Sequence, residues 1–533
     1  MALVAKIFQN LKVPIDEELS THLAWLLPQG FGDVRVLKQS LDARKRHQAH
    51  FVYSVEVAEP GETLKIPSFD LAKVPAKALR GVNKPVVVGS GPAGLFAALR
   101  LVERGVPCRL FERGSPSETR IKGINLFWRY GKLDPRNNVC FGEGGAGLYS
   151  DGKLITRIKS PHIPYVMNRL VKFGAPSEIE YLSNPHVGSD KIRRVIPKMR
   201  QFLIESGCEI YFDTRVTELL SRAPGKIDGI KTEYGDIFES DHVILATGHS
   251  AEDILQHLRD LGVKLEGKSF AMGLRVEHPQ KLINQIQYRD YADHPKLGSA
   301  NYKLTSHDHQ SGLGVYSFCM CPGGYVLSSG TEERRVVVNG MSNYARNSPF
   351  ANSAIVITIN HSQLFKDDLW GGMKMREQLE AAAYEKSLES GGTGRELPTQ
   401  NLLHFLDGKT RSLRKGSSPS GETPVDLSKI LPGWMSDHLR QSLAEFDKSM
   451  RGFLNAEAQL YGVESRTSCP LRVTRDPESL QSLSHQGLYP AGEGAGYAGG
   501  ITSAACDGVK IADQIAAGLH HSFERVDFEH NST

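Results

Sequence analysis

The sequence predicts an α/β fold: a Rossmann-type nucleotide-binding domain built from discontinuous segments, an inserted strand-rich substrate or cap domain, and a small N-terminal α+β domain. Three observations predict it. A short apolar run at 84–88 leads into a glycine-rich turn and a helical pattern. A strand, glycine turn and helix recur at 487–519, and strand-like segments fill 270–360 between them. The predicted domains are 1–80, 84–272 with 455–520, and 273–454.

The N-terminal domain is expected to be α+β from the order of its elements. Helical spacing runs through Glu17–Leu27, and β-like stretches follow at Val34–Gln39 and His50–Glu59. A ferredoxin-like arrangement is compatible with this order. The basic cluster at 42–46 is interpreted as an exposed hairpin or loop and 66–83 as a linker.

The strongest motif begins at Lys84. The apolar run Pro85–Val88 is typical of a buried parallel strand, and the turn Gly89-Ser90-Gly91-Pro92-Ala93-Gly94 leads into a predicted helix over Leu95–Glu103. Gly91 lets the backbone approach a diphosphate, and the helix N-terminus offers free N–H groups to it. Glu112, at the end of the next strand, is placed to accept a ribose hydroxyl.

Further elements are predicted between the two glycine turns. A helix is expected over Lys191–Glu205, and residues 361–455 are expected to be mostly helical. The predicted strands are Glu209–Phe212, Val243–Ala246, Phe270–Val276, Gly314–Phe318, Tyr325–Ser328, Val336–Gly340 and Ala354–Asn360.

Composition excludes several classes of protein. The chain of 533 residues carries 64 basic and 60 acidic side chains, which gives no strong case for a nucleic-acid partner. Seven cysteines are too few for a disulfide scaffold at this length. No apolar run reaches the ~18–20 residues that span a bilayer, and the N-terminus is unlike a secretory signal. A cytoplasmic location without a membrane span is therefore expected, and no metal site is predicted.

The fingerprint resembles that of flavoproteins with two dinucleotide-binding domains. In that superfamily Gly-x-Gly-Pro-Ala-Gly, with a Glu ending the second strand, binds the ADP half of FAD. Ile244–Gly248 is similar to its strand ending in Ala-Thr-Gly, and Leu488–Glu493 to its late strand, with Glu493 in place of Asp. The resemblance implies that Glu493 accepts from a ribityl hydroxyl. It also implies that a helix beginning near Ile501 faces the pyrimidine end of the flavin.

A second glycine cluster lies at 142–147 within Asn138–Leu154. It also matches GxGxxG, but Ser150-Asp151-Gly152 interrupts any following helix, so a close pass over the cofactor is predicted instead of a second Rossmann turn. The cluster resembles a narrower group, the uncharacterised bacterial FAD-dependent dehydrogenase-like proteins. That resemblance extends over nearly the whole chain and implies FAD without an established substrate.

The motifs and the resemblance together give a set of expected site residues. Asp151, Tyr149 and His249 are candidates for proton transfer, each with a purely structural alternative. The expected FAD contacts are Gly89, Gly91, Pro92, Ala93, Gly94, Glu112, Arg113, Gly144, Gly145, Ala146, Val216, Ala246, Thr247, Gly248, Gly492, Glu493, Gly500 and Ile501.

Other polar residues leave two interpretations open. Cys319 and Cys321 are either a redox-active dithiol or two packed cysteines at a strand end. Residues 275, 277 and 278 either line a substrate pocket or form a local salt bridge. Arg466 and Arg472 are candidates to hold an anionic substrate.

The expected function is that of an FAD-dependent oxidoreductase, a dehydrogenase or reductase that transfers hydride at the flavin N5 and acts on a small molecule. Only one Rossmann unit is predicted, so NAD(P)H or an electron-transfer partner would bind transiently. The alternatives are a flavin monooxygenase that uses NAD(P)H and a non-catalytic or RNA-associated FAD-binding protein.

Overall fold

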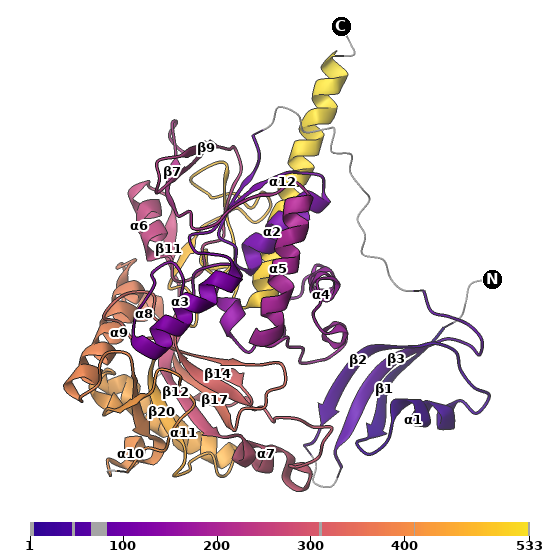
Figure 1. The fold of residues 1–533 in the computed structure, drawn as a ribbon, viewed down its shortest axis with the longest axis vertical. Helices are drawn as coiled ribbons and strands as arrows, with labels where there is room; N and C mark the ends of the chain where they lie inside the picture. The colour runs from indigo at the N-terminus through magenta and orange to yellow at the C-terminus, as the bar shows by residue number, and fades with distance from the viewer. Residues whose placement is uncertain (1–4, 45–47, 66–82, 309–311, 410, 531–533) are drawn as a thin grey trace.

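The computed structural model describes residues 5–44, 48–65, 83–308, 312–409 and 411–530. Most of the predicted linker at 66–83 and the end of the basic cluster at 42–46 lie outside the described residues. Figure 1 shows three sheet-containing parts: a nucleotide-binding part, a larger sheet below it, and the N-terminal unit at one side.

The nucleotide-binding part is centred on a parallel sheet with the strand order β22-β10-β4-β5-β6. Strand β22 comes from near the C-terminus and pairs beside β10, so distant chain segments form one sheet. The sheet elements are β4 (Val86–Val88), β5 (Arg109–Phe111), β6 (Glu209–Tyr211), β10 (Val243–Leu245) and β22 (Leu488–Pro490).

The two faces of this sheet are covered differently. Val87 and Ile244 pack into the cluster beneath the helices, whereas Val86 and Val243 pack on the other side. The helical side has α2 (Pro92–Glu103), α5 (Ser189–Glu205) and α12 (Ile501–His530), with α12 lying along α2. The other side has β7 (Val216–Leu220), β8 (Gly229–Thr232), β9 (Ile237–Glu239) and α6 (Glu252–Asp260).

Several elements of this part were not predicted from the sequence. They are strands β7, β8 and β9, helix α6, helices α3 (Ser117–Tyr130) and α4 (Ile163–Lys172), and the short 3-10 turns η2 (Ala146–Tyr149) and η3 (Ser177–Glu180). After the second glycine cluster the chain makes only the turn η2, as the interruption at 150–152 predicts.

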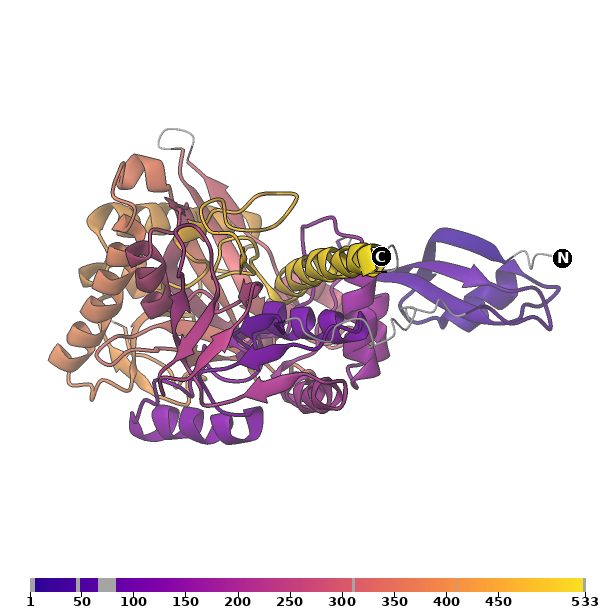
Figure 2. The ribbon, with the colours of Figure 1, turned by 90° about the horizontal axis from the view of Figure 1, so that it is seen from above.

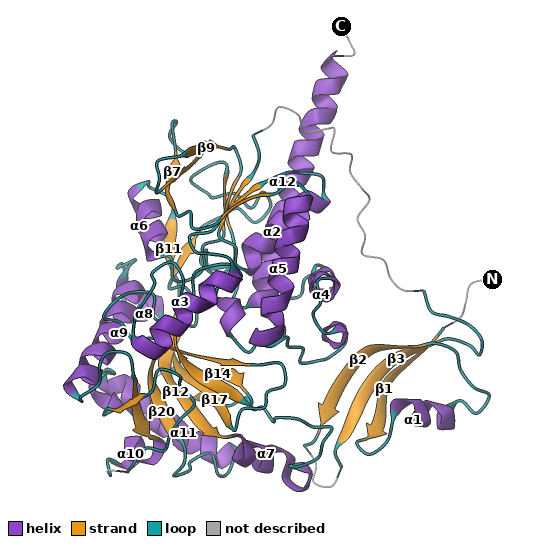
Figure 3. Cartoon of the chain, in the orientation of Figure 1, coloured by secondary structure: helices purple, strands orange, loops and turns teal. Residues whose placement is uncertain are grey.

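The large sheet has seven strands in the order β13-β14-β17-β12-β20-β18-β19. Helices cover its outer side, as the orange and yellow segments of Figure 1 and the helices of Figure 3 show. The strands are β12 (Phe270–Pro279), β13 (Thr305–His307), β14 (Gly314–Cys321), β17 (Phe350–Ile359), β18 (Leu397–Asn401), β19 (Glu422–Pro424) and β20 (Gln459–Glu464).

Smaller elements complete this part. Strands β15 (Gly324–Ser328) and β16 (Val338–Ser342) form a hairpin. Strand β16 begins and ends two residues later than the strand predicted at Val336–Gly340. Strands β11 (Leu265–Gly267) and β21 (Leu471–Val473) form a separate pair. The helices are α7 (Gln280–Tyr288), η4 (Arg289–Tyr291), α8 (His361–Leu364), α9 (Gly371–Glu389), α10 (Leu402–Asp407), η5 (Leu427–Lys429) and α11 (Gly433–Ser449).

The predicted helical stretch at 361–455 also contains β18 and β19. Both join the large sheet, and every residue of β18 is buried although Thr399, Gln400 and Asn401 are polar. The strand has no alternating hydrophobic pattern in the sequence, because these polar side chains make hydrogen bonds inside the protein instead of contributing to an apolar face.

The N-terminal unit is a three-stranded antiparallel sheet with one helix. Its elements are β1 (Lys6–Pro14), α1 (Leu19–Leu26), β2 (Val34–Asp42) and β3 (His50–Val57), with the strand order β1-β3-β2. This is the order of the first four elements of a ferredoxin-like fold. Strand β1 was not predicted, because a bulge between Phe8 and Leu11 breaks its alternation.

The N-terminal unit projects from the side of the molecule (Figure 2), and it contacts the rest through backbone hydrogen bonds, an apolar cluster and polar pairs of Asp16 with His294 and of Glu18 with Lys296. The backbone of Gln39 exchanges hydrogen bonds with Tyr181 and Ser183. A small apolar cluster joins Ile15 and Ala49 to Leu297. Among the helices of the described residues, none has the length and apolar character that crossing a membrane requires.

Candidate dinucleotide-binding site

A long cavity lies at the carboxyl ends of the parallel strands, between the nucleotide-binding part and the seven-stranded sheet. Its space, including solvent at the mouth, is about 1500 Å³. The expected site residues that line it are Gly89, Gly91, Pro92, Ala93, Glu112, Arg113, Gly145, Ala146, Asp151, Val216, Ala246, Thr247, Gly248, His249, Glu493, Gly500 and Ile501.

The fingerprint turn has the geometry that a diphosphate requires. Gly89 has φ +101°, and a Cβ there would lie 2.4 Å from the carbonyl oxygen of Ala246. Gly94 does not line the cavity, because it faces the strand: a Cβ on it would lie 1.9 Å from the Gly89 oxygen. No side chain caps the first turn of α2, so its N–H groups are available to an anion.

The second glycine cluster packs directly against this turn. The Gly144 N–H donates to the Ser90 carbonyl at 3.0 Å, and a Cβ on Gly145 would lie 3.0 Å from Gly91 Cα. Gly144 itself is turned toward Leu148 and does not line the cavity. The cluster therefore passes close over the fingerprint turn, as the sequence predicts.

Arg120 holds the cluster in place from below. This guanidinium is fully buried and donates to the carbonyls of Asn138, Val139, Glu143 and Gly145, at 2.7–3.0 Å. Burial lowers its pKa, and the converging carbonyl oxygens satisfy its donors.

Glu112 makes more contacts than the sequence suggests. One carboxylate oxygen accepts from the N–H and the hydroxyl of Ser90, at 2.9 and 2.7 Å. The other accepts from the N–H groups of Gly114 and Gly142, both at 3.0 Å. Glu112 lines the cavity, but four donors already occupy its carboxylate, so it also ties three loops together.

The late segment brings the C-terminal helix to the cavity. Helix α12 begins at Ile501 as predicted, and Gly500, Ile501 and Glu493 line the wall. Burial raises the pKa of Glu493 to about 7, and the nearby Lys268 opposes that shift. Gly492 does not line the cavity, because its α-carbon faces Ala93: a Cβ there would lie 2.8 Å from the Ala93 Cβ.

The three proton-transfer candidates have different surroundings. Asp151 lines the cavity, but its carboxylate is engaged by Arg346 and by the Ser342 hydroxyl. Tyr149 is buried away from the cavity, with its ring against Trp128. His249 lines the cavity, and its pKa is lowered to about 3, chiefly by burial. Asp151 and Tyr149 are therefore not placed as free proton carriers.

A second wall, which sequence reasoning did not assemble, comes from strands β14 and β20 of the seven-stranded sheet, from β16 and from Lys153 after the second glycine cluster. Lys153, Phe318, Cys319, Asn339, Glu464, Arg466 and Thr467 line it. The sequence analysis names Arg466 and Cys319 as candidates, whereas Lys153 lies within the glycine-rich stretch 138–154 and Glu464 ends β20. Their polarity within glycine-rich or strand-end motifs is the signal that could have identified them.

The two cysteines of the C-x-C motif lie in different surroundings. Cys319 lines the cavity from a bulge in β14, whereas Cys321 is fully buried and its thiol donates to the Cys319 carbonyl at 3.2 Å. Both are free thiols, and burial raises the pKa of each.

The polar residues of β12 form local pairs inside the protein. Arg275 makes a two-point ion pair with Glu464 at 2.8 and 2.9 Å, and Glu277 pairs with Arg414. His278 contacts the Phe453 carbonyl at 2.8 Å. The salt-bridge interpretation of this segment is the one that the structure supports, and Arg472 likewise pairs with Glu266.

The residues present fit FAD. The uncapped first turn of α2 suits a diphosphate, and Gly91 has only Gly145 near its open side. A cavity that continues from this turn to the start of α12 accommodates an elongated dinucleotide.

Comparison with known proteins identifies the family. Residues 269–467 match the family model described as "FAD-dependent protein, C-terminal domain-like", and residues 5–58 match a domain of unknown function, DUF8436. An "Uncharacterized protein" of Clostridium beijerinckii is 38% identical over 494 residues, which cover 90% of this chain and 91% of that protein.

Two further likenesses are more distant. A thiamine thiazole synthase of Pyrobaculum calidifontis is 26% identical over 214 residues, covering 36% of this chain and 69% of that protein. The crystal structure of CtdE in complex with FAD covers 84% of this chain and 93% of its own, at 13% identity and a TM-score of 0.32. The chain thus binds FAD and belongs to the same family as the Clostridium beijerinckii protein.

Proposed function

We propose that the protein is an FAD-dependent oxidoreductase, a dehydrogenase or reductase for a small molecule. The observation that carries the proposal is the two-sided cavity: one wall is made by the FAD-binding loops, and the other by polar side chains from the seven-stranded sheet, from β16 and from Lys153. When bound, FAD supplies the capacity to accept or donate hydride at N5. A protein that only stored FAD would not need a second polar wall facing the same space.

Lys153 is the residue best placed to hold an oxygen of the substrate. Its ammonium contacts the Met320 carbonyl and lies 3.9 Å from Asp151, whose carboxylate is already engaged by Arg346. An ammonium has three donors, so Lys153 retains donor capacity toward the cavity. We therefore favour a substrate that bears a carboxylate or carbonyl oxygen.

The same wall has few free proton acceptors. Glu464 is held at two points by Arg275, and Asp151 by Arg346. Burial raises the pKa of the Cys319 thiol, which therefore stays protonated at neutral pH. We therefore assign the side chains of this wall to orienting the substrate and balancing its charge, and the redox change to FAD.

The reductant or oxidant that completes the cycle is proposed to bind transiently. The described residues form a single parallel sheet of the Rossmann type, and FAD takes the crevice at its strand ends. NAD(P)H or an electron-transfer partner would reach the flavin through the cavity mouth. Neither nucleic acid nor a membrane is part of this proposal.

Anaerobic titration of the purified yellow protein tests the function. NADH, NADPH and a panel of 2-hydroxy and 2-amino acids are added while the flavin absorbance is followed, and 2-oxo acids are tested for reoxidation of the reduced flavin. Bleaching by one of the reductants supports the proposal, and Lys153→Met should slow that bleaching while the flavin stays bound. A His404→Phe variant, altered outside the cavity-lining set, should behave as the wild type.

Other results would select the alternatives. Oxygen consumption that depends on both NAD(P)H and an organic substrate would indicate a monooxygenase. If no reductant bleaches the flavin, and the dithionite-reduced protein is not reoxidised by oxygen, quinones or enoyl and keto acceptors, a non-catalytic FAD-binding protein is indicated. Retention of RNA that falls with salt would indicate the RNA-associated alternative.

A further inference from the structure

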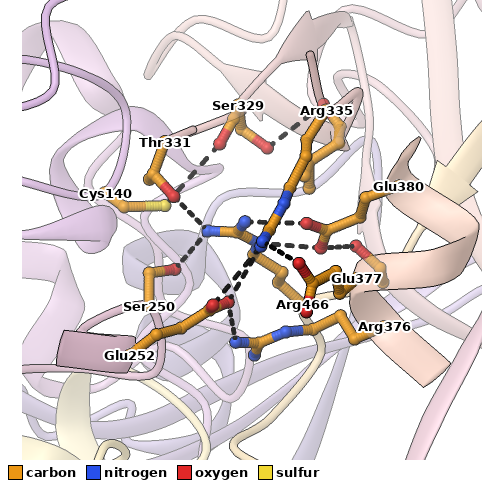
Figure 4. A network of polar contacts seen from close by, with 12 residues as sticks. Cys140, Ser250, Glu252, Ser329, Thr331, Arg335, Arg376, Glu377, Glu380 and Arg466 are labelled. Carbon is orange, nitrogen blue, oxygen red and sulfur yellow. Dashed lines mark hydrogen bonds and ion pairs between the residues drawn. The ribbon is translucent and has the colours of Figure 1, made fainter. Parts of the chain in front are cut away.

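A buried polar network joins the large sheet to the end of β10, next to the FAD cavity. Figure 4 shows the guanidinium of Arg466 between the Glu380 carboxylate and the hydroxyls of Ser250 and Thr331. Arg466 follows β20, Glu380 lies on α9, and Ser250 follows the cavity-lining His249. The network therefore connects three elements to one ring that faces the cofactor space.

Arg466 determines the direction of the hydrogen bonds. It donates to both oxygens of Glu380 at 2.8 and 3.0 Å, and to the Ser250 hydroxyl oxygen at 2.9 Å. Because a guanidinium has no acceptor, the Ser250 oxygen must accept this bond. The hydroxyl hydrogen of Ser250 is then free to point elsewhere.

Among the described residues, the other hydrogen-bonding neighbour of that hydroxyl is the His249 ring. Its Nδ1 lies 2.8 Å from the Ser250 oxygen, and Ser250 is 2% exposed. If Nδ1 carried a hydrogen, the Ser250 hydroxyl would have to accept twice, and its own buried hydrogen would lose this partner at a cost of about 1–3 kcal/mol. The favoured arrangement therefore has Ser250 donating to a bare Nδ1.

The charge state of the ring follows from its surroundings. Burial, and then the positive charges of Arg466 and Arg376, lower the pKa of His249 to about 3. Glu380 and the backbone carbonyl of His249 act in the opposite direction but do not outweigh them. Arg376 also donates to that carbonyl at 3.2 Å, which fixes the backbone of His249. A neutral ring with a bare Nδ1 carries its single hydrogen on Nε2.

We propose that the chain from Glu380 through Arg466 and Ser250 fixes His249 as a neutral Nε2–H donor to an acceptor atom of bound FAD. His249 then positions the cofactor and does not exchange protons with a substrate. Arg466 acts through Ser250 and is a positioning residue. The inference rests on FAD binding alone, so it stands or falls independently of the proposed oxidoreductase reaction.

The tautomer can be observed directly. In the protein with ¹⁵N-labelled histidine, the resonances of His249 are those missing from His249→Phe, and they should show a protonated Nε2 and an unprotonated Nδ1. Ser250→Ala, which removes the hydroxyl donor, should shift this tautomer, whereas Ser250→Thr should preserve it. Arg466→Lys, which cannot keep the same fork of hydrogen bonds, should also alter it. A wild-type ring protonated on Nδ1 would overturn the proposal.

Binding provides a second readout. His249→Phe should weaken FAD binding to the apoprotein about 5–10-fold, the equivalent of one hydrogen bond of roughly 1 kcal/mol. Binding of ADP and of riboflavin to His249→Phe and to the wild type then locates the acceptor atom. Weaker ADP competition in the variant places the acceptor on the ADP half of FAD. Weaker riboflavin binding with a shifted flavin absorbance band places it on the flavin half. His404→Phe is the control. Unchanged affinity for all three ligands in a folded His249→Phe protein would refute the donor.

Discussion

Glu112 provides a test of how the FAD site is held together before the cofactor binds. Its carboxylate accepts two hydrogen bonds on each oxygen, from Ser90 on one side and from Gly114 and Gly142 on the other. In Glu112→Gln, one oxygen becomes an NH₂ group, which is a donor. If the NH₂ group turns toward Ser90, the Ser90 hydroxyl can accept from it, but the buried Ser90 N–H still loses its acceptor.

The cost follows from these contacts. A buried donor that loses its acceptor costs roughly 1–3 kcal/mol, which is the loss expected from the Ser90 N–H. A typical protein domain is stable by only ~5–15 kcal/mol. The Glu112→Gln apoprotein should therefore unfold at clearly lower temperature and denaturant concentration than the wild type, even though FAD is absent from both.

The measurement is unfolding of the apoproteins followed by circular dichroism, with FAD affinity measured in parallel. Glu239→Gln is the matched control, because Glu239 is an exposed residue paired with the exposed Arg222. If Glu112→Gln lowers FAD affinity but leaves apoprotein unfolding unchanged, Glu112 acts only as a ribose ligand. The reasoning about the three loops would then be refuted.

Three further predictions follow from the site. Gly145→Ala should weaken FAD binding about tenfold, because the Gly145 φ is +60° and the new Cβ would lie 3.0 Å from Gly91 Cα. Fluorescence titration with FAD measures the affinity, and Gly433→Ala is the control, because a Cβ on Gly433 meets no atom within 4 Å. Because the pKa of Glu493 rises from 4.5 to about 7 on folding, the folded apoprotein holds a proton that the unfolded chain releases. Apoprotein stability should thus fall as pH rises through this window, and Glu493→Gln should flatten that part of the profile. Arg275→Leu should destabilise the apoprotein by about 3–5 kcal/mol, because it leaves the buried Glu464 carboxylate unpaired. Adding Glu464→Leu should recover much of this loss. Equal melting temperatures for the single and the double variant would contradict the prediction.

Local motifs allowed the nucleotide-binding turn to be predicted, because its requirements are written in adjacent residues. A buried strand, a turn with φ +101° at Gly89 and an uncapped helix start all lie within 84–103. The late helix at Ile501 was predicted for the same reason. The role of Glu112 was predicted only in part, since the N–H of Gly142 reaches it from a loop thirty residues away.

The second wall of the cavity could not be predicted from the sequence, because its residues come from strands far apart in the chain. Cys319 lies on β14, whereas Arg466 follows β20, and the two meet only through the order of strands in the large sheet. Tyr149 shows the opposite limit. It lies next to residues that line the cavity, but the turn η2 directs its ring into the core.

The first turn of α2 explains why the FAD site needs both ends of the chain. Gly508 of α12 lies so close that a Cβ would come within 2.0 Å of the Ala93 oxygen, and Gly492 packs against the Ala93 Cβ. Gly145 covers the same turn from the middle cluster. Side chains at these positions would push the segments apart. The three contacts therefore enclose the turn while its N–H groups remain open to the cavity, so the partial positive charge of α2 acts where the diphosphate binds.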